Sequence, residues 1–219
     1  MNMEHINVIT VNLNNREGLE KTMQSVVSQS YFDSIRYIVI DGGSTDGSLD
    51  VIDRRMGDID VWVSEKDGGI YNAMNKGLSY AEDGYTIFLN SGDLFSSHYV
   101  VGMVVPFLDR DIVYGDLRVH RRNGSHFIKK YTPYIEPDYF TYEAIPHEAS
   151  FVRTSLYKSI GFREDYRILS DSIFFHEAIF RRSASYKHIS EVVTDFCLGG
   201  ISSDEELLKA ERIRYFGKG

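Results

Sequence analysis

The chain has 219 residues, of which 42% are hydrophobic and 26% are charged, and its formal net charge is −8. This length supports one sizeable hydrophobic core, and the composition excludes a disordered or fibrous protein. The acidic balance argues against nucleic acid as a partner, because chains that bind nucleic acid are typically basic.

The single cysteine, Cys197, excludes an internal disulfide and is typical of a reducing compartment. We expect it to be a small buried residue, since no cluster that would activate a thiolate surrounds it in the sequence. Residues 1–9 are too short and too polar for a signal peptide, and no apolar run approaches the roughly 20 residues that span a bilayer. The sequence therefore predicts a cytoplasmic protein, with any membrane contact peripheral and at the inner face of the plasma membrane.

The first half of the chain alternates predicted strands with predicted helices. Apolar runs predict strands at residues 6–13, 37–41, 61–63 and 85–89. Helices between them are predicted from apolar residues at helical spacing, which are Leu19, Met23, Val26 and Val27, then Leu49, Val51 and Ile52, then Ile70, Ala73, Met74, Leu78 and Ala81. Asn14 or Asn15 is the expected cap of the first helix. This alternation favours an α/β fold with a doubly wound, mostly parallel sheet and helices on both faces.

After Asp93 the pattern is less regular. Further elements are predicted as a helix at 100–108, a strand at 112–114, a hairpin of 117–120 with 126–129 through an Asn123-Gly124 turn, a strand at 150–152 and a helix at 172–182 that begins at Ser170 or Asp171. A last helix is expected over 204–215, with a weak apolar stripe of Leu207, Leu208 and Ile213. The sequence shows neither a repeat nor a clear linker.

An acid ends the second predicted strand. Asp41 is followed by Gly42, Gly43 and Ser44, and glycines let a ligand approach the backbone closely. A carboxylate at the carboxyl edge of a sheet suits hydrogen bonds from a base or a ribose. The alternative is a plain helix-capping turn, because hydroxyls and Asp46 follow directly. No GxGxxG fingerprint is present, which argues against a Rossmann dehydrogenase.

Two further strand ends carry acids. Asp67 lies in residues 64–77, after the third strand and before a helix, with loop capping as the alternative and Lys66 as a solvated side chain. Asp93 closes the Asn90–Asp93 turn, where one hard oxygen ligand lets a divalent ion bind while diphosphate oxygens and waters complete its shell. The alternative for Asp93 is a structural turn without a metal.

Two candidate residues come from the second half. Asp171 lies where a helix is predicted to begin, so it is either a helix cap or a carboxylate that projects into the crevice as a general base. His147 follows a proline in a turn and is either a structural histidine or a catalytic one.

In this order, the motifs resemble the inverting, nucleotide-sugar-dependent glycosyltransferases of family 2 with the GT-A fold, especially bacterial members that build capsule, O-antigen or exopolysaccharide. The resemblance rests on residues 6–15, 38–48, 65–77, 89–94, 146–153 and 162–171. Residues 199–202 also look like the loop that closes over the site. The resemblance implies one GT-A domain over 1–219, with a nucleotide-sugar-binding half at 1–95, an acceptor-binding half at 96–203 and a helical tail at 204–219.

The resemblance also implies roles for individual residues. Asp41 looks like the acid that reads the uracil ring, Val11 and Leu13 stand where the family borders the base, and Asp67 is similar to the second donor-site acid. The implied nucleotide-sugar-binding set is Val11, Leu13, Asp41, Asp67, Ser91 and Gly92. Many relatives have an aromatic residue where Leu13 stands, so the expected stacking on the base is weaker here.

The catalytic roles follow in the same way. Asp93 resembles the metal-binding member of the family's DxD element, which implies Mn²⁺ or Mg²⁺ as cofactor. Asp171 resembles the catalytic base, and His147 falls near the acceptor entrance. Many relatives carry further acids where Asn90 and Gly92 stand, so a modest metal affinity is expected, with the diphosphate supplying the other oxygens.

The leading functional hypothesis is transfer of a hexosyl or N-acetylhexosaminyl group from a UDP-sugar to a glycan or polyprenol-linked acceptor. A sugar-phosphate nucleotidyltransferase is the second, disfavoured because no glycine-rich basic loop near the N-terminus would hold a triphosphate. The third is a catalytically silent nucleotide- or glycan-binding subunit, suggested by the thinned DxD element. The sequence leaves the sugar, the linkage and the oligomeric state open.

Two surface features carry more than one interpretation. The basic pairs 121–122, 129–130 and 181–182 are solvated faces or contacts for anionic headgroups. The aromatic segment 131–142 is a flap over the core, an acceptor platform or a dimer contact.

Overall fold

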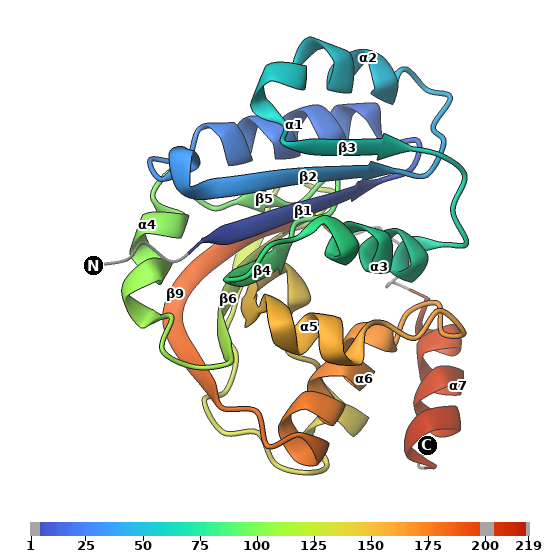
Figure 1. Cartoon of the computed structure of the whole chain (residues 1–219). Coiled ribbons are helices and arrows are strands. Elements are labelled where there is room, and N and C mark those ends of the chain that lie inside the picture. Colours follow the sequence, from blue (N-terminus) through green and yellow to red (C-terminus); the bar gives the residue numbers. More distant parts are fainter. Residues whose placement is uncertain (1–4, 198–203, 218–219) are drawn as a thin grey trace.

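The structure is a computed structural model that describes residues 5–197 and 204–217 (Figure 1). Its strands are β1 (Ile6–Asn12), β2 (Ile35–Asp41), β3 (Val61–Ser64), β4 (Tyr85–Phe88), β5 (Leu94–Phe95), β6 (Ile112–His120), β7 (His126–Lys129), β8 (Ser150–Arg153) and β9 (Tyr186–Cys197). Its α-helices are α1 (Arg16–Val27), α2 (Ser48–Arg54), α3 (Ile70–Tyr80), α4 (Val100–Val104), α5 (Thr154–Ile160), α6 (Ser170–His176) and α7 (Glu205–Phe216). In these residues the strands form one nine-stranded sheet in the order β3-β2-β1-β4-β8-β6-β9-β5, with β7 paired to β6.

The predicted parallel half is present. β1 pairs in parallel with β2 and with β4, and β2 pairs in parallel with β3, so their carboxyl ends meet at one edge. Alternate residues of β1 and β2 face opposite cores: Val8 packs with α1 and α2, whereas Ile9 packs with α3. Figure 1 shows α1 and α2 on one side of the sheet and α3 on the other. Asn15 caps α1 by accepting a hydrogen bond from the Gly18 amide.

The second half extends the sheet beyond β4. β8 lies antiparallel between β4 and β6, as the 150–152 run predicted. The predicted hairpin is confirmed, with Leu117 opposite Lys129 and Gly124 at a φ of 82° in the turn. The sequence did not predict β9, which has twelve residues and pairs in parallel with β6, and it did not predict α5. The predicted 172–182 helix begins at Ser170 and continues from α6 as a π-helix, Glu177–Arg181.

The last helix packs through only part of the predicted apolar stripe. Leu208 and Tyr215 of α7 lie against a buried cluster of Tyr166, Leu169 and Ile173, whereas Ile213, expected in the apolar stripe, is 45% exposed. Within the described residues, no helix has the length and apolar character needed to cross a bilayer.

Two other expectations meet the structure here. Cys197 is exposed, so the prediction of a buried residue was wrong. In the aromatic segment 131–142, Ile135, Tyr139 and Phe140 are buried, which favours the core-flap interpretation.

The loop at 199–202, which resembles the family's closing loop, lies outside the described residues. The sheet takes strands from both predicted halves of the domain, and the division at residue 95 stays a prediction.

Candidate active site

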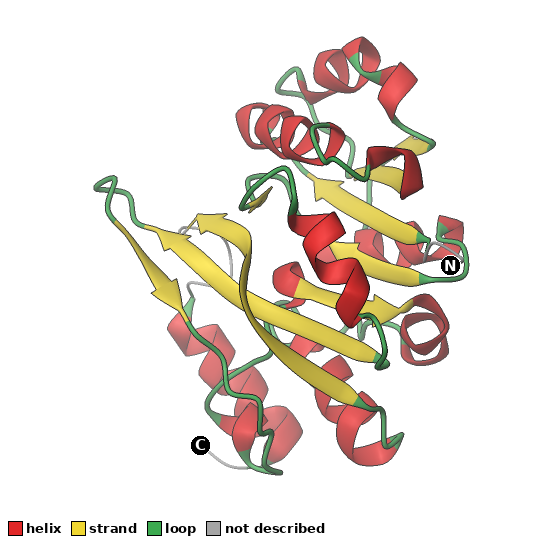
Figure 2. Cartoon of the chain, turned by 90° about the vertical axis from the view of Figure 1, so that its left-hand side faces the viewer, coloured by secondary structure: helices red, strands yellow, loops and turns green. Residues whose placement is uncertain are grey.

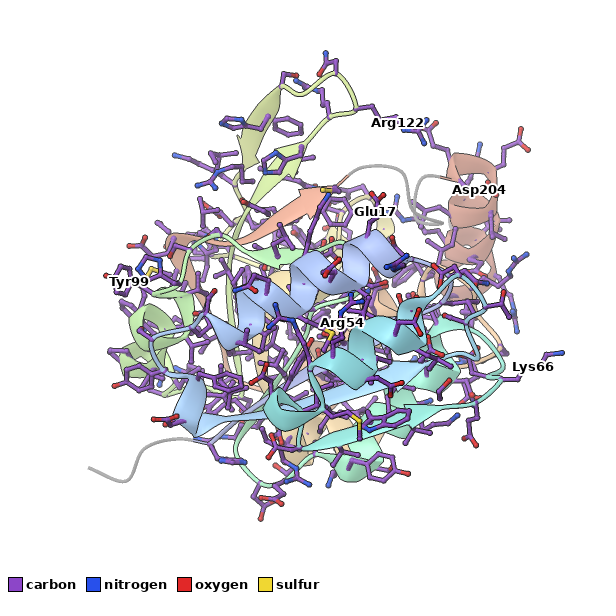
Figure 3. All side chains as sticks on the ribbon, turned by 90° about the horizontal axis from the view of Figure 1, so that it is seen from above. Glu17, Arg54, Lys66, Tyr99, Arg122 and Asp204 are labelled. Atoms are coloured by element: carbon purple, nitrogen blue, oxygen red, sulfur yellow. The ribbon has the colours of Figure 1, made fainter. Side chains whose placement is uncertain are left out.

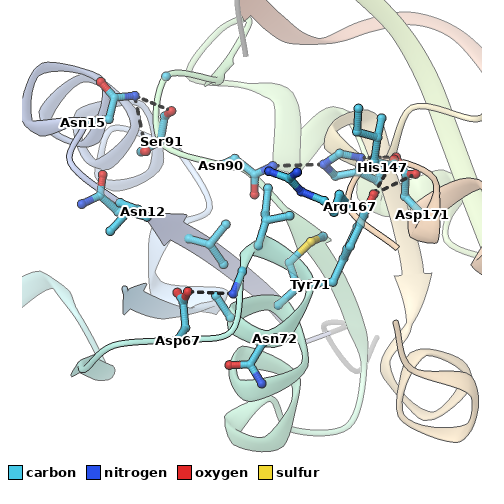
Figure 4. Close-up of a pocket in the computed structure, with 18 of the residues that line it drawn as sticks. Asn12, Asn15, Asp67, Tyr71, Asn72, Asn90, Ser91, His147, Arg167 and Asp171 are labelled. Atoms are coloured by element: carbon cyan, nitrogen blue, oxygen red, sulfur yellow. Dashed lines mark hydrogen bonds and ion pairs between the residues drawn. The ribbon is translucent and has the colours of Figure 1, made fainter. Parts of the chain in front are cut away.

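A cavity of about 860 Å³ opens where β1 and β4 end and α3 begins (Figure 4). This volume lies in the range of ligand-binding clefts. The sequence-predicted residues that line it are Val11, Leu13, Asp67, Ser91, Gly92, Asp93, His147 and Asp171. The structure thus joins the strand ends of the first half to the two candidates of the second.

Asp41 is the exception, because its buried carboxylate lies beside the cavity and is engaged by the protein. Oδ1 accepts hydrogen bonds from Asn12 Nδ2 at 2.8 Å and Ser44 Oγ at 2.6 Å. Oδ2 accepts from the amides of Gly43 and Ser44 and from Ser64 Oγ. Burial alone would raise the pKa of Asp41, but these donors lower it, so the group stays ionised. Asp41 therefore organises the loop, and its contact with a uracil ring stays a prediction.

Asp67 lines the cavity, unlike Asp41, and Gly42 leaves space for its carboxylate. Oδ1 of Asp67 accepts a hydrogen bond from the Gly69 amide at 2.9 Å. A Cβ atom on Gly42 would lie 2.5 Å from Oδ2 of Asp67, closer than any normal contact. The side chain of Leu13, 56% exposed, lies next to the same point. The glycine after Asp41 is thus a requirement for the position of Asp67.

Helix α1 holds the turn that ends in Asp93. Asn15 Nδ2 donates to the Ser91 carbonyl at 2.8 Å, and the Gly92 amide donates to Thr22 Oγ1 at 2.9 Å. Thr22 Oγ1 in turn donates to the Asp93 carbonyl at 2.8 Å. Gly92 has a φ of 109°, a conformation that favours glycine. These contacts fix the direction in which Asp93 faces the cavity.

Asp93 is buried next to a second carboxyl group. Burial, and then the nearby Glu148 carboxylate, raise the pKa of Asp93 well above its usual range. In the part of the chain that the structure describes, no three His, Cys, Asp or Glu side chains are grouped to hold a metal. Oδ1 of Asn90, in the same turn, is buried without a hydrogen-bond partner. The Asp93 carboxylate by itself fits a divalent ion shared with a diphosphate, since such ions keep few protein ligands, and a cation here would relieve the carboxylate repulsion.

His147 uses both ring nitrogens within the protein. Nδ1 lies 3.0 Å from Asp171 Oδ2 and 3.3 Å from Glu148 Oε2, and Nε2 lies 3.1 Å from Asn90 Nδ2. Burial alone would lower the pKa of His147, but the surrounding carboxylates, Glu148 first, raise it to about 9. His147 is therefore a cation at neutral pH. Turning the Asn90 amide over places its unpartnered oxygen against the Nε2 hydrogen and satisfies both groups.

This cation predicts a stability loss at alkaline pH. A folded-state pKa of about 9 against 6.5 stabilises the folded protein fully below pH 6.5 and is lost as the pH rises to 9. We expect the free energy of unfolding to fall by about 3 kcal/mol over that window in the wild type and much less in His147→Gln. Denaturant titrations at several pH values measure both. Parallel curves for the two proteins would show that His147 titrates normally.

Asp171 lies in the first turn of α6, and the helix-cap alternative was wrong because Leu169 is the cap residue. Its Oδ1 accepts hydrogen bonds from the Ser172 amide at 2.7 Å and from the Tyr71 hydroxyl at 3.3 Å. Its Oδ2 faces His147. The carboxylate is thus held from three sides while it lines the cavity.

Glu211 of α7 holds the segment before Asp171 and was not identified from the sequence. Its carboxylate is buried and accepts hydrogen bonds from the backbone amides of Arg167 at 2.7 Å, Ile168 at 3.0 Å and Leu169 at 3.0 Å. These amides precede α6, so Glu211 serves as a capping acceptor from another helix. Only the tertiary contact reveals this role, because in the sequence Glu211 is one of several charges on a helix.

Other cavity residues were also missed. Polar and aromatic ones are Asn12, Asn15, Tyr71, Asn72, Asn90, Arg122, Glu164, Tyr166, Arg167 and Phe196. Arg167 lines the cavity and has no ion pair among the described residues. The sequence feature that could have identified Arg167 is its position four residues before the candidate base Asp171. Arg122 and Phe196 come from the hairpin and β9, so their position required the unpredicted pairing of β6 with β9.

The fold defines the class of protein. TarS of S. aureus, solved as residues 1–349 with UDP-GlcNAc, matches 96% of this chain and 67% of its own with a TM-score of 0.74 and 18% identity. The mannosyltransferase PcManGT of Pyrobaculum calidifontis, solved with GDP-Man and Mn²⁺, matches 90% of this chain and 58% of its own with a TM-score of 0.69 and 16% identity. The chain spans 37% of the longer solved TarS chain. These likenesses identify the GT-A glycosyltransferase fold.

The chain belongs to glycosyl transferase family 2, whose model matches residues 7–188. The uncharacterized glycosyltransferase Rv1514c of Mycobacterium tuberculosis is 34% identical over 178 residues, covering 79% of this chain and 68% of that protein. A PGL/p-HBAD biosynthesis glycosyltransferase of Mycobacterium bovis is 28% identical over 218 residues, covering 92% and 82%. The putative teichuronic acid biosynthesis glycosyltransferase TuaG of Bacillus subtilis is 37% identical over 94 residues, covering 40% and 36%.

Proposed function

We propose that this glycosyltransferase moves a sugar, hexosyl or N-acetylhexosaminyl, from a UDP-sugar to a hydroxyl of a glycan or polyprenol-linked acceptor and inverts its configuration. The observation that carries the proposal is that one cavity is lined by Asp67, Asp93 and Asp171 together. The likeness to TarS, solved with UDP-GlcNAc, supports the donor. The names of the mycobacterial and Bacillus relatives, which refer to PGL/p-HBAD and teichuronic acid biosynthesis, support a role in the synthesis of polysaccharides or glycolipids. We place this synthesis at the inner face of a bacterial membrane as part of the proposal.

The donor half of the proposal starts at the sheet edge. Asp67 presents the carboxylate that accepts hydrogen bonds from the uracil ring or the ribose, while Val11 and Leu13 supply apolar contact to the base. Asn12 and Asp41 keep the loop that supports Asp67 in place through the network at Ser44. Because this network already exists without ligand, little ordering remains to be done when the nucleotide binds.

The diphosphate meets the Asn90–Asp93 turn and Arg167. Asp93 would hold Mn²⁺ or Mg²⁺ jointly with the diphosphate oxygens, and such an ion supplies positive charge against the departing UDP. Arg167 adds a positive charge, since this exposed residue lines the cavity and has no ion pair in the described part of the chain. Both contributions act where negative charge develops as the sugar leaves.

Asp171 then acts as the general base. A carboxylate oxygen of Asp171 takes the proton of the acceptor hydroxyl while the hydroxyl oxygen attacks the anomeric carbon from the face opposite UDP. The bond between the anomeric carbon and UDP breaks as the new glycosidic bond forms, so the configuration inverts. His147 and the Ser172 amide orient the carboxylate. We propose that His147 lies at the acceptor entrance and that its main role is to orient Asp171.

Two alternatives remain from the sequence. Family membership argues against a sugar-phosphate nucleotidyltransferase. The single acid of the Asn90–Asp93 turn is the observation that favours a silent nucleotide- or glycan-binding subunit. Such a subunit would bind the nucleotide or glycan without transferring a sugar. Sugar transfer by the wild-type protein from any UDP-sugar would exclude it.

Thermal unfolding with UDP, GDP, dTDP and CMP, each with and without Mn²⁺, tests the donor assignment. UDP with Mn²⁺ at a hundred times its dissociation constant is expected to add about 2.7 kcal/mol to the stability. We expect the largest shift for this combination. No shift with any nucleotide would contradict the proposed site, and a larger shift with another nucleotide would contradict the choice of UDP.

The same assay examines Asp67 through Gly42. In Gly42→Ala the new Cβ displaces the Asp67 carboxylate, so UDP binding is expected to weaken by about tenfold. Gly57→Ala is the matched control, because a Cβ there meets nothing within 4 Å. Equal UDP affinity for both variants would show that the position of Asp67 does not matter for the nucleotide.

A further inference from the structure

The β6–β7 hairpin forms one end of the sheet. Within the described residues β7 pairs only with β6, so its outer edge carries no strand, whereas the β6 arm pairs with β9 as far as His120 and Cys197. In Figure 2 its turn lies at the upper left, beyond the other strands. Three of the four β7 residues are exposed. We call residues 117–130 the basic hairpin.

Charge is concentrated in this segment. The basic hairpin holds Arg118, Arg121, Arg122, Lys129 and Lys130, and no acid occurs from 117 to 135, in a chain of net charge −8. Arg118 pairs with Asp195, and Lys129 pairs with Glu143. The other three cations have no ion pair within residues 5–197 and 204–217. This segment is thus a local cationic surface on an acidic protein.

Two large apolar side chains are exposed between these cations. Phe127 is 38% exposed and Ile128 is 40% exposed. They alternate along β7, so one lies on each face of the ribbon. The guanidinium of Arg121 lies 4.5 Å from the centre of the Phe127 ring. Cations next to exposed aromatic and aliphatic groups match a surface with an anionic layer over an apolar one.

We propose that the basic hairpin docks on an anionic lipid bilayer. A soluble anionic glycan would satisfy the cations but would leave Phe127 and Ile128 in water, whereas a bilayer accommodates both. Arg122, next to the turn, also lines the cavity, and Figure 3 shows it extending from the hairpin on the side of the molecule where α7 lies. Docking therefore brings the cavity mouth to the membrane. The inference concerns binding alone and stands independently of the proposed sugar transfer.

Vesicle flotation tests the proposal directly. The wild-type protein is expected to float with vesicles of phosphatidylglycerol and phosphatidylcholine and to stay behind with phosphatidylcholine alone. Binding should weaken as salt is added, because exposed charges are screened. The double variant Arg121→Glu with Lys130→Glu, which avoids the cavity residue Arg122, is expected to lose at least about tenfold in binding.

A matched control and an apolar variant complete the design. Arg181→Glu with Arg182→Glu makes the same charge change on another exposed pair. That pair precedes Tyr186, which lies opposite Ile112 at the far end of β6, about 25 Å of strand from the turn. We expect this control to float like the wild type. Equal loss in both variants would mean that net charge, and not the hairpin, controls binding, and would overturn the proposal.

Phe127→Ser with Ile128→Ser separates a membrane from a soluble polyanion. Flotation is expected to weaken by at least about tenfold, while retention on immobilised dextran sulfate stays unchanged. Undiminished flotation of this variant, or failure of the wild type to float with anionic vesicles, would overturn the proposal. The melting temperature of each variant shows whether it folds, and these exposed positions are expected to leave it near the wild-type value.

Discussion

Replacing Asp171 by asparagine is expected to lower kcat by ~10³-fold, because an amide cannot take the proton of the acceptor hydroxyl. The amide keeps the size of the side chain and an oxygen that accepts from the Ser172 amide. UDP binding, measured by thermal shift, should stay within a few-fold of the wild type. The loss then lies in the chemical step and not in donor affinity.

Asp165→Asn is the matched control for this experiment. It makes the same acid-to-amide change six residues earlier, where an exposed carboxylate pairs with Arg163 and Arg214. Such surface pairs contribute about 0–1 kcal/mol, so normal kcat is expected. If Asp171→Asn kept a kcat within tenfold of the wild type, another group would have to be the base.

Removing the Glu211 carboxylate is expected to weaken the fold and the activity together. Glu211→Ala leaves three backbone amides, those of Arg167 to Leu169, without their charged acceptor, and two of these contacts are fully buried. We expect a loss of about 3 kcal/mol in the free energy of unfolding and roughly 6–12 °C in the melting temperature. Because the same segment carries Arg167 and leads into Asp171, kcat should fall even below the melting transition.

Two further variants test the stability loss predicted for Glu211→Ala. Glu211→Gln keeps the shape and one acceptor oxygen and is expected to lose less stability than the alanine variant. Glu206→Ala removes an exposed acid from the same helix and should change the stability by no more than about 0.5 kcal/mol. A Glu211→Ala protein as stable as the Glu206→Ala protein would show that water replaces the carboxylate without cost.

The ends of the parallel strands were predictable from the sequence, and so were some of the residues that line the cavity there, Asp67 and Asp93 among them. The reason is geometric: carboxyl ends of parallel strands meet at one edge, so acids such as Asp67 and Asp93 converge without knowledge of the rest of the fold. The Asn123-Gly124 turn was equally readable, because its backbone conformation restricts the residue types that occupy it. The predicted contact between Asp41 and a uracil ring has a different basis, because it came from the family resemblance and not from this geometry.

The remaining parts depended on tertiary contacts. At a strand end the sequence does not tell whether a carboxylate faces a cavity or its own loop, as Asp41 does. β9 was missed because its polar and apolar residues follow no single period, and its pairing with β6 contains register shifts after Tyr114. Cys197 was assigned to the core for the same reason, since its exposure follows from the end of that strand.

The position of Glu211 shows that the residues matched by the family model are fewer than the residues that support the candidate site. The family model matches residues 7–188, yet the backbone amides that lead into Asp171 are held by a side chain on α7, beyond that match. A fragment designed from the family match would contain every strand-end acid and the candidate base and would lack the side chain that holds the segment before Asp171. For protein engineering, a fragment that keeps this contact therefore has to extend through α7, beyond the residues that the family model matches.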